Sequence, residues 1–274
     1  MFMKLKDGKS KVLTLSYDDG VVQDKRLMEI MNKYGLKGTF NINSGLYAPE
    51  NADTGRTSGR MTLEEAKELY LNSGHEVAVH ALTHPFLESL NSEEIIYEVT
   101  EDRKNIEKEF GSLARGMAYP FGTYNDKVVD ILEKCGIVYS RTVLSTESFS
   151  FPENWLTLHP TCHHNNPKLM DLADDFINAD IRFNRNKMFY LWGHSYEFDN
   201  LDNWNVIEEF AEKVGGKDDV WYATNIEIYD YVKAYEQLQT SYDRKIIHNP
   251  TSIDVWVCDN KQTFVIKAGE TVYR

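Results

Sequence analysis

The chain has 274 residues, a length that fits one large domain as readily as two small ones. Hydrophobic residues make up 42% of the chain and charged residues 27%, which is ordinary for a globular protein with a full core. The formal net charge of −13 argues against a nucleic-acid partner or an anionic membrane surface. No stretch approaches the roughly 18 apolar residues of a membrane span.

The start of the chain and the cysteines bear on the cellular location. Residues 1–11 carry lysines but no apolar core, so they predict no signal peptide. Three scattered cysteines, Cys135, Cys162 and Cys258, do not form a disulfide framework. We therefore expect a cytoplasmic, reducing location, although a secreted chain without its signal would look the same.

Strand and helix signals alternate along most of the chain. The expected strands cover residues 13–17, 38–43, 76–80, 116–119, 137–143, 156–161, 188–192 and 220–223. The expected helices cover residues 24–34, 62–74, 92–110, 127–135, 168–180, 204–214 and 226–239. Seven or eight such units predict an α/β fold whose parallel sheet closes into an irregular barrel.

The end of the chain has a different pattern. Residues 253–258 and 263–267 are rich in β-forming residues, and the Asp259-Asn260 pair between them is a hairpin signal. We therefore expect residues 1–245 to form the main domain. Residues 246–274 should form a short β-rich tail packed on that domain.

Polar side chains follow four of the expected strands. Asp18 and Asp19 end the first strand, His80 follows the third, residues 119–122 follow the fourth, and His194 follows a later one. The C-terminal ends of parallel barrel strands meet on one face of the barrel. We therefore expect these residues to converge on a single active site.

Two adjacent carboxylates and two histidines predict a metal centre. His80 and His84 can reach one ion from one face of a helix or from one side of a tight turn. Asp18 and Asp19 point in different directions from an extended chain, so one can bind the metal while the other acts on the bound water. One carboxylate and two imidazoles leave an open coordination position, as in catalytic zinc sites. The pattern predicts a hydrolase that activates water on a divalent metal, with zinc favoured over cobalt, nickel or manganese.

His194 is a candidate proton donor to a leaving group, because an imidazole titrates near neutral pH. Residues 162–164, Cys-His-His, could mimic a soft metal site, but no matching partner cluster is visible in the sequence. Aromatic residues after the strands could form a wall that stacks on a sugar: Phe121, Tyr124, Trp192 and Tyr196.

Together these motifs resemble those of the polysaccharide deacetylases of the NodB-homology type, carbohydrate esterase family 4. Residues 16–20 read Ser-Tyr-Asp-Asp-Gly where the family has Thr-Phe-Asp-Asp-Gly. Residues 80–84 read His-Ala-Leu-Thr-His where it has His-Ser/Thr-x-x-His, and residues 191–194 match its Leu-x-x-His. The resemblance covers roughly residues 10–235 in the right order.

The resemblance implies a distorted (β/α) barrel of about seven strands and an enzyme that removes acetyl groups from an N- or O-acetylated carbohydrate. It implies three metal ligands: Asp19, His80 and His84. It also implies that Asp18 is the general base and His194 the general acid, and that the backbone N–H of Phe121 helps to hold the oxyanion.

The chain departs from the family in its third and fourth motifs. Residues 118–122 read Ala-Tyr-Pro-Phe-Gly where the family often has Arg-Pro-Pro-Tyr-Gly, so the arginine that braces the catalytic aspartate is absent. Arg141 after the next strand is the expected substitute. Trp155 could be the tryptophan of the fourth motif, and Glu147 or Glu153 could orient the acid histidine. The expected oxyanion and substrate contacts are Phe121, Tyr119, Arg141 and Trp192.

Two other functions stay open at this point. The metal motif also fits a hydrolase of a non-sugar amide, and the missing arginine would suit a carbohydrate-binding protein that has lost catalysis. For the deacetylase and for the carbohydrate-binding protein alike, the expected partner is an acetylated carbohydrate. We expect no nucleic-acid partner and no membrane span. The β-rich tail suggests a lid or a contact in a homo-oligomer.

Overall fold

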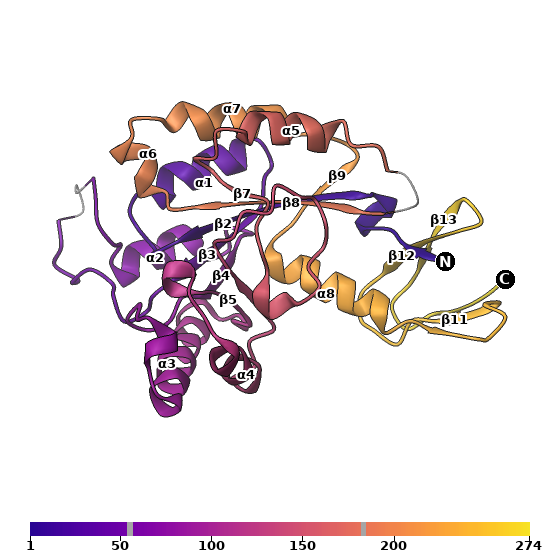
Figure 1. Ribbon diagram of the computed structural model, residues 1–274, viewed down its shortest axis with the longest axis horizontal. Coiled ribbons are helices and arrows are strands. Elements are labelled where there is room, and N and C mark those ends of the chain that lie inside the picture. The colour runs from indigo at the N-terminus through magenta and orange to yellow at the C-terminus, as the bar shows by residue number, and fades with distance from the viewer. Residues whose placement is uncertain (54–56, 182–184) are drawn as a thin grey trace.

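The computed structural model describes residues 1–53, 57–181 and 185–274, and its centre is a parallel sheet (Figure 1). Among these residues the strand order is β6-β5-β4-β3-β2-β8-β7, and β9 pairs with β2 beside this path. The strands are β2 (Lys11–Asp18), β3 (Gly38–Ile42), β4 (Glu76–Val79), β5 (Gly116–Ala118), β6 (Tyr139–Arg141), β7 (Cys162–His163), β8 (Lys187–Gly193) and β9 (Val220–Tyr222). The expected distorted barrel is therefore confirmed.

The irregular segment of residues 158–161 links β6, at one edge of the curled sheet, to β8, next to the other edge. The N–H of Leu158 donates to the carbonyl oxygen of Ser140 in β6 at 2.9 Å. Three residues later, the N–H of Thr161 donates to the carbonyl oxygen of Tyr190 in β8 at 2.8 Å. The same segment thus pairs first with one outer strand and then with the other side of the sheet, which makes the barrel irregular.

The strand expected over residues 156–161 is displaced in the structure. Trp155–Thr157 form a 3-10 helix, and only Cys162–His163 pair as strand β7. The side chain of Asn154 accepts a hydrogen bond from the N–H of Leu156 at 2.9 Å, which starts a turn where the sequence predicts extended chain.

Strand β2 is the centre of the sheet, and all of its residues are buried. Its first half lies between β8 and β9, where Leu13 pairs with both Phe189 and Tyr222, and its second half lies between β8 and β3. Its apolar residues alternate with buried polar ones such as Thr14 and Ser16, so it departs from the nearly continuous apolar run typical of a parallel strand covered on both faces. Asp18 ends this strand, so it stands in the middle of the face formed by the C-terminal strand ends.

Helices cover the outside of the sheet, with α1, α5 and α7 along the upper side of Figure 1 and α3 and α4 along the lower side. The helices are α1 (Asp24–Lys33), α2 (Leu63–Tyr70), α3 (Ser92–Phe110), α4 (Asp126–Lys134), α5 (Leu169–Ile177), α6 (Tyr196–Asn200), α7 (Trp204–Val214) and α8 (Asn225–Glu236). A capping box of Thr62 and Glu65 begins α2, and the helix ends at Tyr70, before the end expected at residue 74. Helix α6 has no counterpart in the sequence analysis.

The tail forms two small antiparallel sheets at one end of the molecule (Figure 1). In one, β12 (Val255–Asp259) and β13 (Gln262–Ile266) make the expected hairpin, and β1 (Phe2–Met3) from the start of the chain pairs with β12. The other contains β10 (Gln239–Thr240), β11 (Ile246–His248) and β14 (Thr271–Tyr273). Apolar side chains from both sheets are buried together with Ala234 of α8.

None of the helices within residues 1–53, 57–181 and 185–274 is both long and apolar enough to cross a membrane.

Candidate active site

The C-terminal ends of β2, β4 and β8 bring together the residues that the motifs single out. Asp18 is the last residue of β2 and Asp19 follows it, while His80 follows β4 and His194 follows β8. Oδ2 of Asp18 lies 3.9 Å from Nε2 of His80 and 3.9 Å from Nε2 of His194. The structure therefore places these four residues on one face of the barrel.

A tight turn, and not a helix, places His84 beside His80. Ala81 and His84 have left-handed backbone angles, with φ of 62° and 56°, which are uncommon for residues other than glycine. Asn43 at the end of β3 donates from Nδ2 to the carbonyl oxygen of Ala81 at 2.7 Å and also to that of His80. These bonds hold the turn, and the two imidazole rings lie 4.8 Å apart between centroids.

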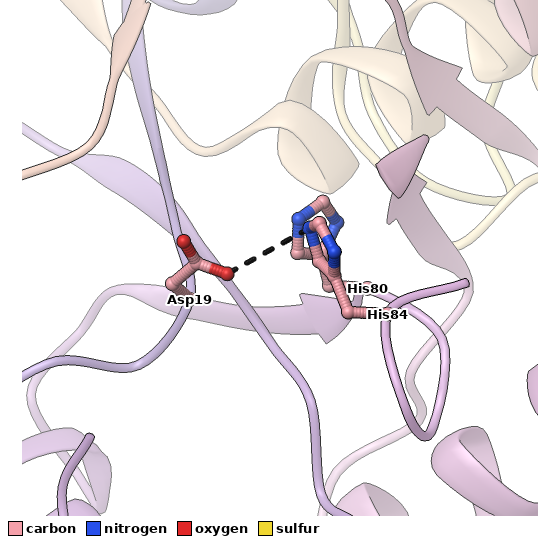
Figure 2. Close-up of side chains that lie close together, drawn as sticks. All are labelled: Asp19, His80 and His84. Carbon is pink, nitrogen blue, oxygen red and sulfur yellow. Dashed lines mark ion pairs between the residues drawn. The ribbon is translucent and has the colours of Figure 1, made fainter. Parts of the chain in front are cut away.

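Asp19, His80 and His84 form a group that could hold a metal ion, and Figure 2 shows Asp19 facing both histidines. Their ligand atoms lie within 4.8 Å of one another, and Nε2 of His84 is 3.8 Å from Oδ1 of Asp19. Nδ1 of His80 lies 2.8 Å from the carbonyl oxygen of Ala118, so Nδ1 carries the proton and Nε2 keeps its lone pair. Burial lowers the pKa of His80 to about 4 and lowers that of His84, so both rings are neutral at pH 7. This donor set fits a divalent ion such as zinc.

Asp18 is buried, and its neighbours hold it in the ionised state. Arg141 donates to its Oδ2, and Asn41 donates from Nδ2 to its Oδ1 at 2.9 Å. Burial by itself would raise the pKa of Asp18, but Arg141, with His80 and His194, lowers it below the ordinary value. The Asp18 carboxylate is therefore free of its own proton near neutral pH.

Arg141 occupies the role left open by the missing arginine of residues 118–122. It ends β6, which pairs with β5, and its side chain is 1% exposed. Its guanidinium group lies over the ring of Trp192, 4.2 Å from the ring centroid. The contact expected between Arg141 and Asp18 is thus made, although the arginine comes from a neighbouring strand. The same stacking buries Trp192 beneath Arg141.

Glu197 of α6 holds His194, so the expectation that Glu147 or Glu153 would do so is wrong. Oε1 of Glu197 lies 2.9 Å from Nδ1 of His194. Glu147 instead pairs with Lys168 at 2.7 Å, and Glu153 is exposed. The reason is local, because α6 begins two residues after the histidine and turns the glutamate back toward it at a spacing of one helical turn.

This arrangement favours the protonated form of His194. Burial by itself would lower the pKa of His194, but the hydrogen bond to Glu197 and the charges of Asp18 and Asp19 raise it above the ordinary value. Because Glu197 engages Nδ1, the other ring nitrogen, Nε2, faces Asp18 across 3.9 Å.

His163 and His164 also lie close to the Glu197 carboxylate. Nε2 of His163 lies 3.2 Å and Nε2 of His164 lies 2.9 Å from Oε2 of Glu197. The backbone N–H of Asn165 donates to Nδ1 of His163 at 3.1 Å. His163, His164 and Glu197 lie close enough together to form a second group that could hold an ion.

Only part of the expected aromatic wall lies on the active face. Tyr119 donates from its hydroxyl to the carbonyl oxygen of Leu156 at 2.8 Å, and its ring stacks on Tyr124 with centroids 4.8 Å apart. Trp155 packs edge-on against Tyr229 of α8 instead of supporting the acid histidine. These side chains therefore pack against the protein itself.

Phe121 and Tyr196 do lie beside the site. The ring of Phe121 meets that of His84 nearly at right angles, with centroids 4.4 Å apart. The ring of Tyr196 lies 5.2 Å from that of His194. One aromatic ring thus flanks the candidate metal ligands and another flanks the candidate acid.

Residues 5–140 match the family model described as polysaccharide deacetylase. This part of the chain belongs to the polysaccharide deacetylase family. The matched region includes Asp18, Asp19, His80 and His84, whereas Arg141, His194 and Glu197 lie beyond its end. A similar curated protein is chitin deacetylase 1 of Cryptococcus neoformans var. grubii, which is 27% identical over 124 residues. That stretch is 45% of this chain and 24% of the relative, so the match spans about a quarter of the fungal protein.

Solved structures share the fold of this chain. A protein described as a polysaccharide deacetylase from Mycobacterium smegmatis superposes with a TM-score of 0.61 at 17% identity, over 86% of this chain and 94% of that one. A family 4 carbohydrate esterase from Streptomyces lividans, solved with acetate, gives a TM-score of 0.50 at 17% identity, over 77% and 91% of the two chains. At these identities the likeness shows the barrel fold alone.

Two further side chains of the site were not identified from the sequence. Arg60 donates to Oδ1 of Asp19 at 2.8 Å. Asp102 of α3 accepts the backbone N–H groups of His80 at 3.0 Å and of Ser44 at 2.7 Å, and burial raises its pKa to about 7. Both residues look like ordinary surface charges in the sequence. Glu197 could have been found from its spacing after His194.

Proposed function

We propose that this chain is a metal-dependent deacetylase that removes acetyl groups from an N- or O-acetylated carbohydrate. The observation that carries the proposal is the position of Asp18, whose Oδ2 lies 3.9 Å from Nε2 of both His80 and His194. A candidate base, a candidate acid and a candidate metal ligand thus surround one small region. The family match of residues 5–140 supports acetyl groups of polysaccharides as the substrate class.

Asp19, His80 and His84 are the residues that would hold the ion. A bound divalent metal would supply Lewis acidity, which polarises an acyl oxygen and lowers the pKa of water. Neutral imidazoles and one carboxylate leave the site with net positive charge, which favours this chemistry. We expect zinc, with cobalt, nickel and manganese as substitutes.

The remaining steps belong to side chains of the protein. Asp18 accepts the proton of the attacking water, because Arg141 keeps its carboxylate ionised. We expect the backbone N–H of Phe121 to donate a hydrogen bond to the developing oxyanion, as the resemblance to the family implies. His194, protonated with its Nδ1 held by Glu197, gives the proton on Nε2 to the departing amine or hydroxyl.

Acetate release tests this function directly. The protein is stripped of metal with a chelator, resupplied with zinc or cobalt, and assayed on a panel of N- and O-acetylated oligosaccharides. We expect almost no acetate from the stripped protein and restored release with metal, since the three ligands are assembled by the fold. Release that survives the chelator would contradict the metal assignment, and no release from any sugar would contradict the substrate class.

The contact of Arg141 with Asp18 bears on the two alternatives. A carbohydrate-binding protein without catalysis was favoured by the missing motif arginine, and Arg141 supplies that charge from β6. A non-sugar amide substrate would use the same residues. In the acetate assay, an acetylated amide without a sugar is therefore included as a competing substrate.

Replacing Glu197 by glutamine should change the pH dependence of catalysis. Glu197 raises the pKa of His194, and the acid must be protonated to act, so activity falls as the pH rises through that pKa. Without the charge, the pKa of His194 drops, and the alkaline limb of the kcat/KM profile should move to lower pH. Profiles of both proteins measure this shift. Glu147→Gln is the matched control, and an unmoved limb in the Glu197 variant would contradict the assignment.

A further inference from the structure

Three side chains beside His194 bring their ligand atoms together, and we name this group the second cluster: His163, His164 and Glu197. His163 ends β7 and His164 follows it, while Glu197 is the second residue of α6. Nε2 of each ring lies within 3.2 Å of Oε2 of Glu197. The Cys-His-His run of residues 162–164 therefore has a partner that the sequence did not reveal, and that partner is a carboxylate.

Hydrogen bonding does not account for the approach of His164 to Glu197. The side chain of His164 is 0% exposed, and burial lowers its pKa to about 4, so the ring is neutral at pH 7. Its Nε2 lies 2.9 Å from Oε2 of Glu197, but the ring does not direct this nitrogen at that oxygen. Neither ring nitrogen has a hydrogen-bond partner among the described residues. Because buried polar atoms are nearly always paired, an unpaired imidazole beside a carboxylate indicates a ligand site.

The fold fixes both imidazole rings of the second cluster. The ring of His164 stacks on that of Phe198 with centroids 4.2 Å apart. A Cβ atom added to Gly193 would come within 2.0 Å of Nδ1 of His164, so only glycine leaves room for this ring at the end of β8. The ring of His163 meets that of Trp192 edge-on, with centroids 4.6 Å apart. Side chains that are already ordered lose little entropy when a ligand binds.

The carboxylate of Glu197 can serve His194 and an ion at the same time. Oε1 lies 2.9 Å from Nδ1 of His194, and Oε2 accepts a hydrogen bond from Nδ2 of Asn165 at 3.0 Å. Burial by itself would raise the pKa of Glu197, but the histidines around it hold the pKa below its usual range, so it is ionised. A carboxylate oxygen has two lone pairs, so Oε2 can bind an ion and keep the bond from Asn165.

We propose that the second cluster binds a divalent transition-metal ion, with zinc as the preferred occupant. Two imidazoles and one carboxylate suit zinc and its neighbours cobalt, nickel and copper. Three protein ligands leave a fourth position for water, and the side chains of His163 and Glu197 are 22% and 23% exposed, which opens a path for the ion. Because Nε2 of His194 faces Asp18 and its Nδ1 faces Glu197, the ion would lie behind the candidate acid, apart from the ligands of the candidate active site.

Zinc should bind less tightly to the second cluster than to the ligands of the candidate active site. Nδ1 of His163 accepts the backbone N–H of Asn165 at 3.1 Å. Coordination through Nε2 requires the proton on Nδ1, so this hydrogen bond must be given up. His80 meets no such cost, because its Nδ1 already faces the carbonyl oxygen of Ala118.

Zinc titration of the full chain tests the proposal. The stripped protein is titrated with zinc chloride against a chromogenic chelator, and the bound zinc is counted by elemental analysis. We expect two zinc ions per chain, the second with a Kd at least about tenfold higher than the first. His163→Gln, at a partly exposed position, should keep the first ion and raise the Kd of the second at least about a hundredfold, since it removes a ligand. His248→Phe is the matched control, because it removes a histidine of β11 in the tail and should keep both ions.

Two further variants keep the result clear if His163→Gln alters the fold. Glu197→Gln should likewise lose the second ion alone, whereas Asp19→Asn should lose the tighter ion and keep this one. A wild-type chain that binds a single zinc ion would overturn the proposal, and so would a second ion that persists in both the His163 and the Glu197 variants. Because ion binding is measured without a substrate, an absence of acetate release would count against the proposed function and leave this result standing.

Discussion

Asp18→Asn is expected to lower kcat by about a thousandfold, the loss typical of removing a general base. Asparagine keeps the shape of the side chain and can still accept a hydrogen bond from Arg141, but it cannot take a proton from water. The metal ligands are Asp19, His80 and His84, so the variant should bind metal as the wild type does. Steady-state kinetics and metal content by elemental analysis measure the two effects.

The neighbouring residue supplies the control for this prediction. Asp19→Asn removes a candidate ligand and should lose metal together with activity. The two adjacent substitutions therefore separate a base from a ligand. If Asp18→Asn kept wild-type kcat, Asp18 would not be the base, and if it lost the metal, Asp18 would belong to the ligand set.

Arg141→Met should destabilise the protein by about 3–5 kcal/mol, because it leaves the buried Asp18 carboxylate without its cation. The pKa of Asp18 should rise, since burial favours the protonated acid once Arg141 is gone. The acid limb of the kcat/KM profile should then move to higher pH. Urea unfolding and the pH profile measure both effects.

The loss of stability in the Arg141 variant should depend on pH. It arises from the ionised Asp18 carboxylate, which has no cation beside it, and protonation of Asp18 at low pH removes it. The difference in unfolding free energy between wild type and variant should therefore be larger at pH 8 than at pH 5. Arg141→Lys keeps the charge and should recover part of the stability. A Met variant as stable as the wild type at pH 8 would show that Arg141 does not neutralise Asp18.

Much of the barrel and its catalytic face could be predicted from the sequence. The buried strands could be recognised from short runs of apolar residues, which in β2 alternate with the buried Thr14 and Ser16. Polar residues directly after such runs must lie on one face, which brings Asp18, His80 and His194 together. The spacing of His80 and His84 suits a helix or a turn, but the strand before His80 and Pro85 after His84 favour a turn, and the structure has one there.

The side chains that contact Asp18 and His194 could not be predicted in the same way, because they come from other segments of the chain. Arg141 reaches Asp18 across 123 positions of the chain, and no local pattern assigns a buried arginine to a given carboxylate. Glu197 was missed because α6 was not expected, so two glutamates of an earlier loop were considered instead. The stacking of Phe86 on Phe121 likewise joins the loops of two neighbouring strands.

The alternation of strands and helices, the β-rich tail and the polar residues at the strand ends, Asp18, Asp19, His80 and His194, could be predicted from the amino-acid sequence. Periodicity and caps encode those features within a few residues, so they can be read locally. The folded structure was needed to show which charged side chain lies beside each of these residues, which ring nitrogen is free and which aromatic rings are exposed. Those properties depend on burial and on side chains brought together by the sheet, and both arise only when the barrel forms.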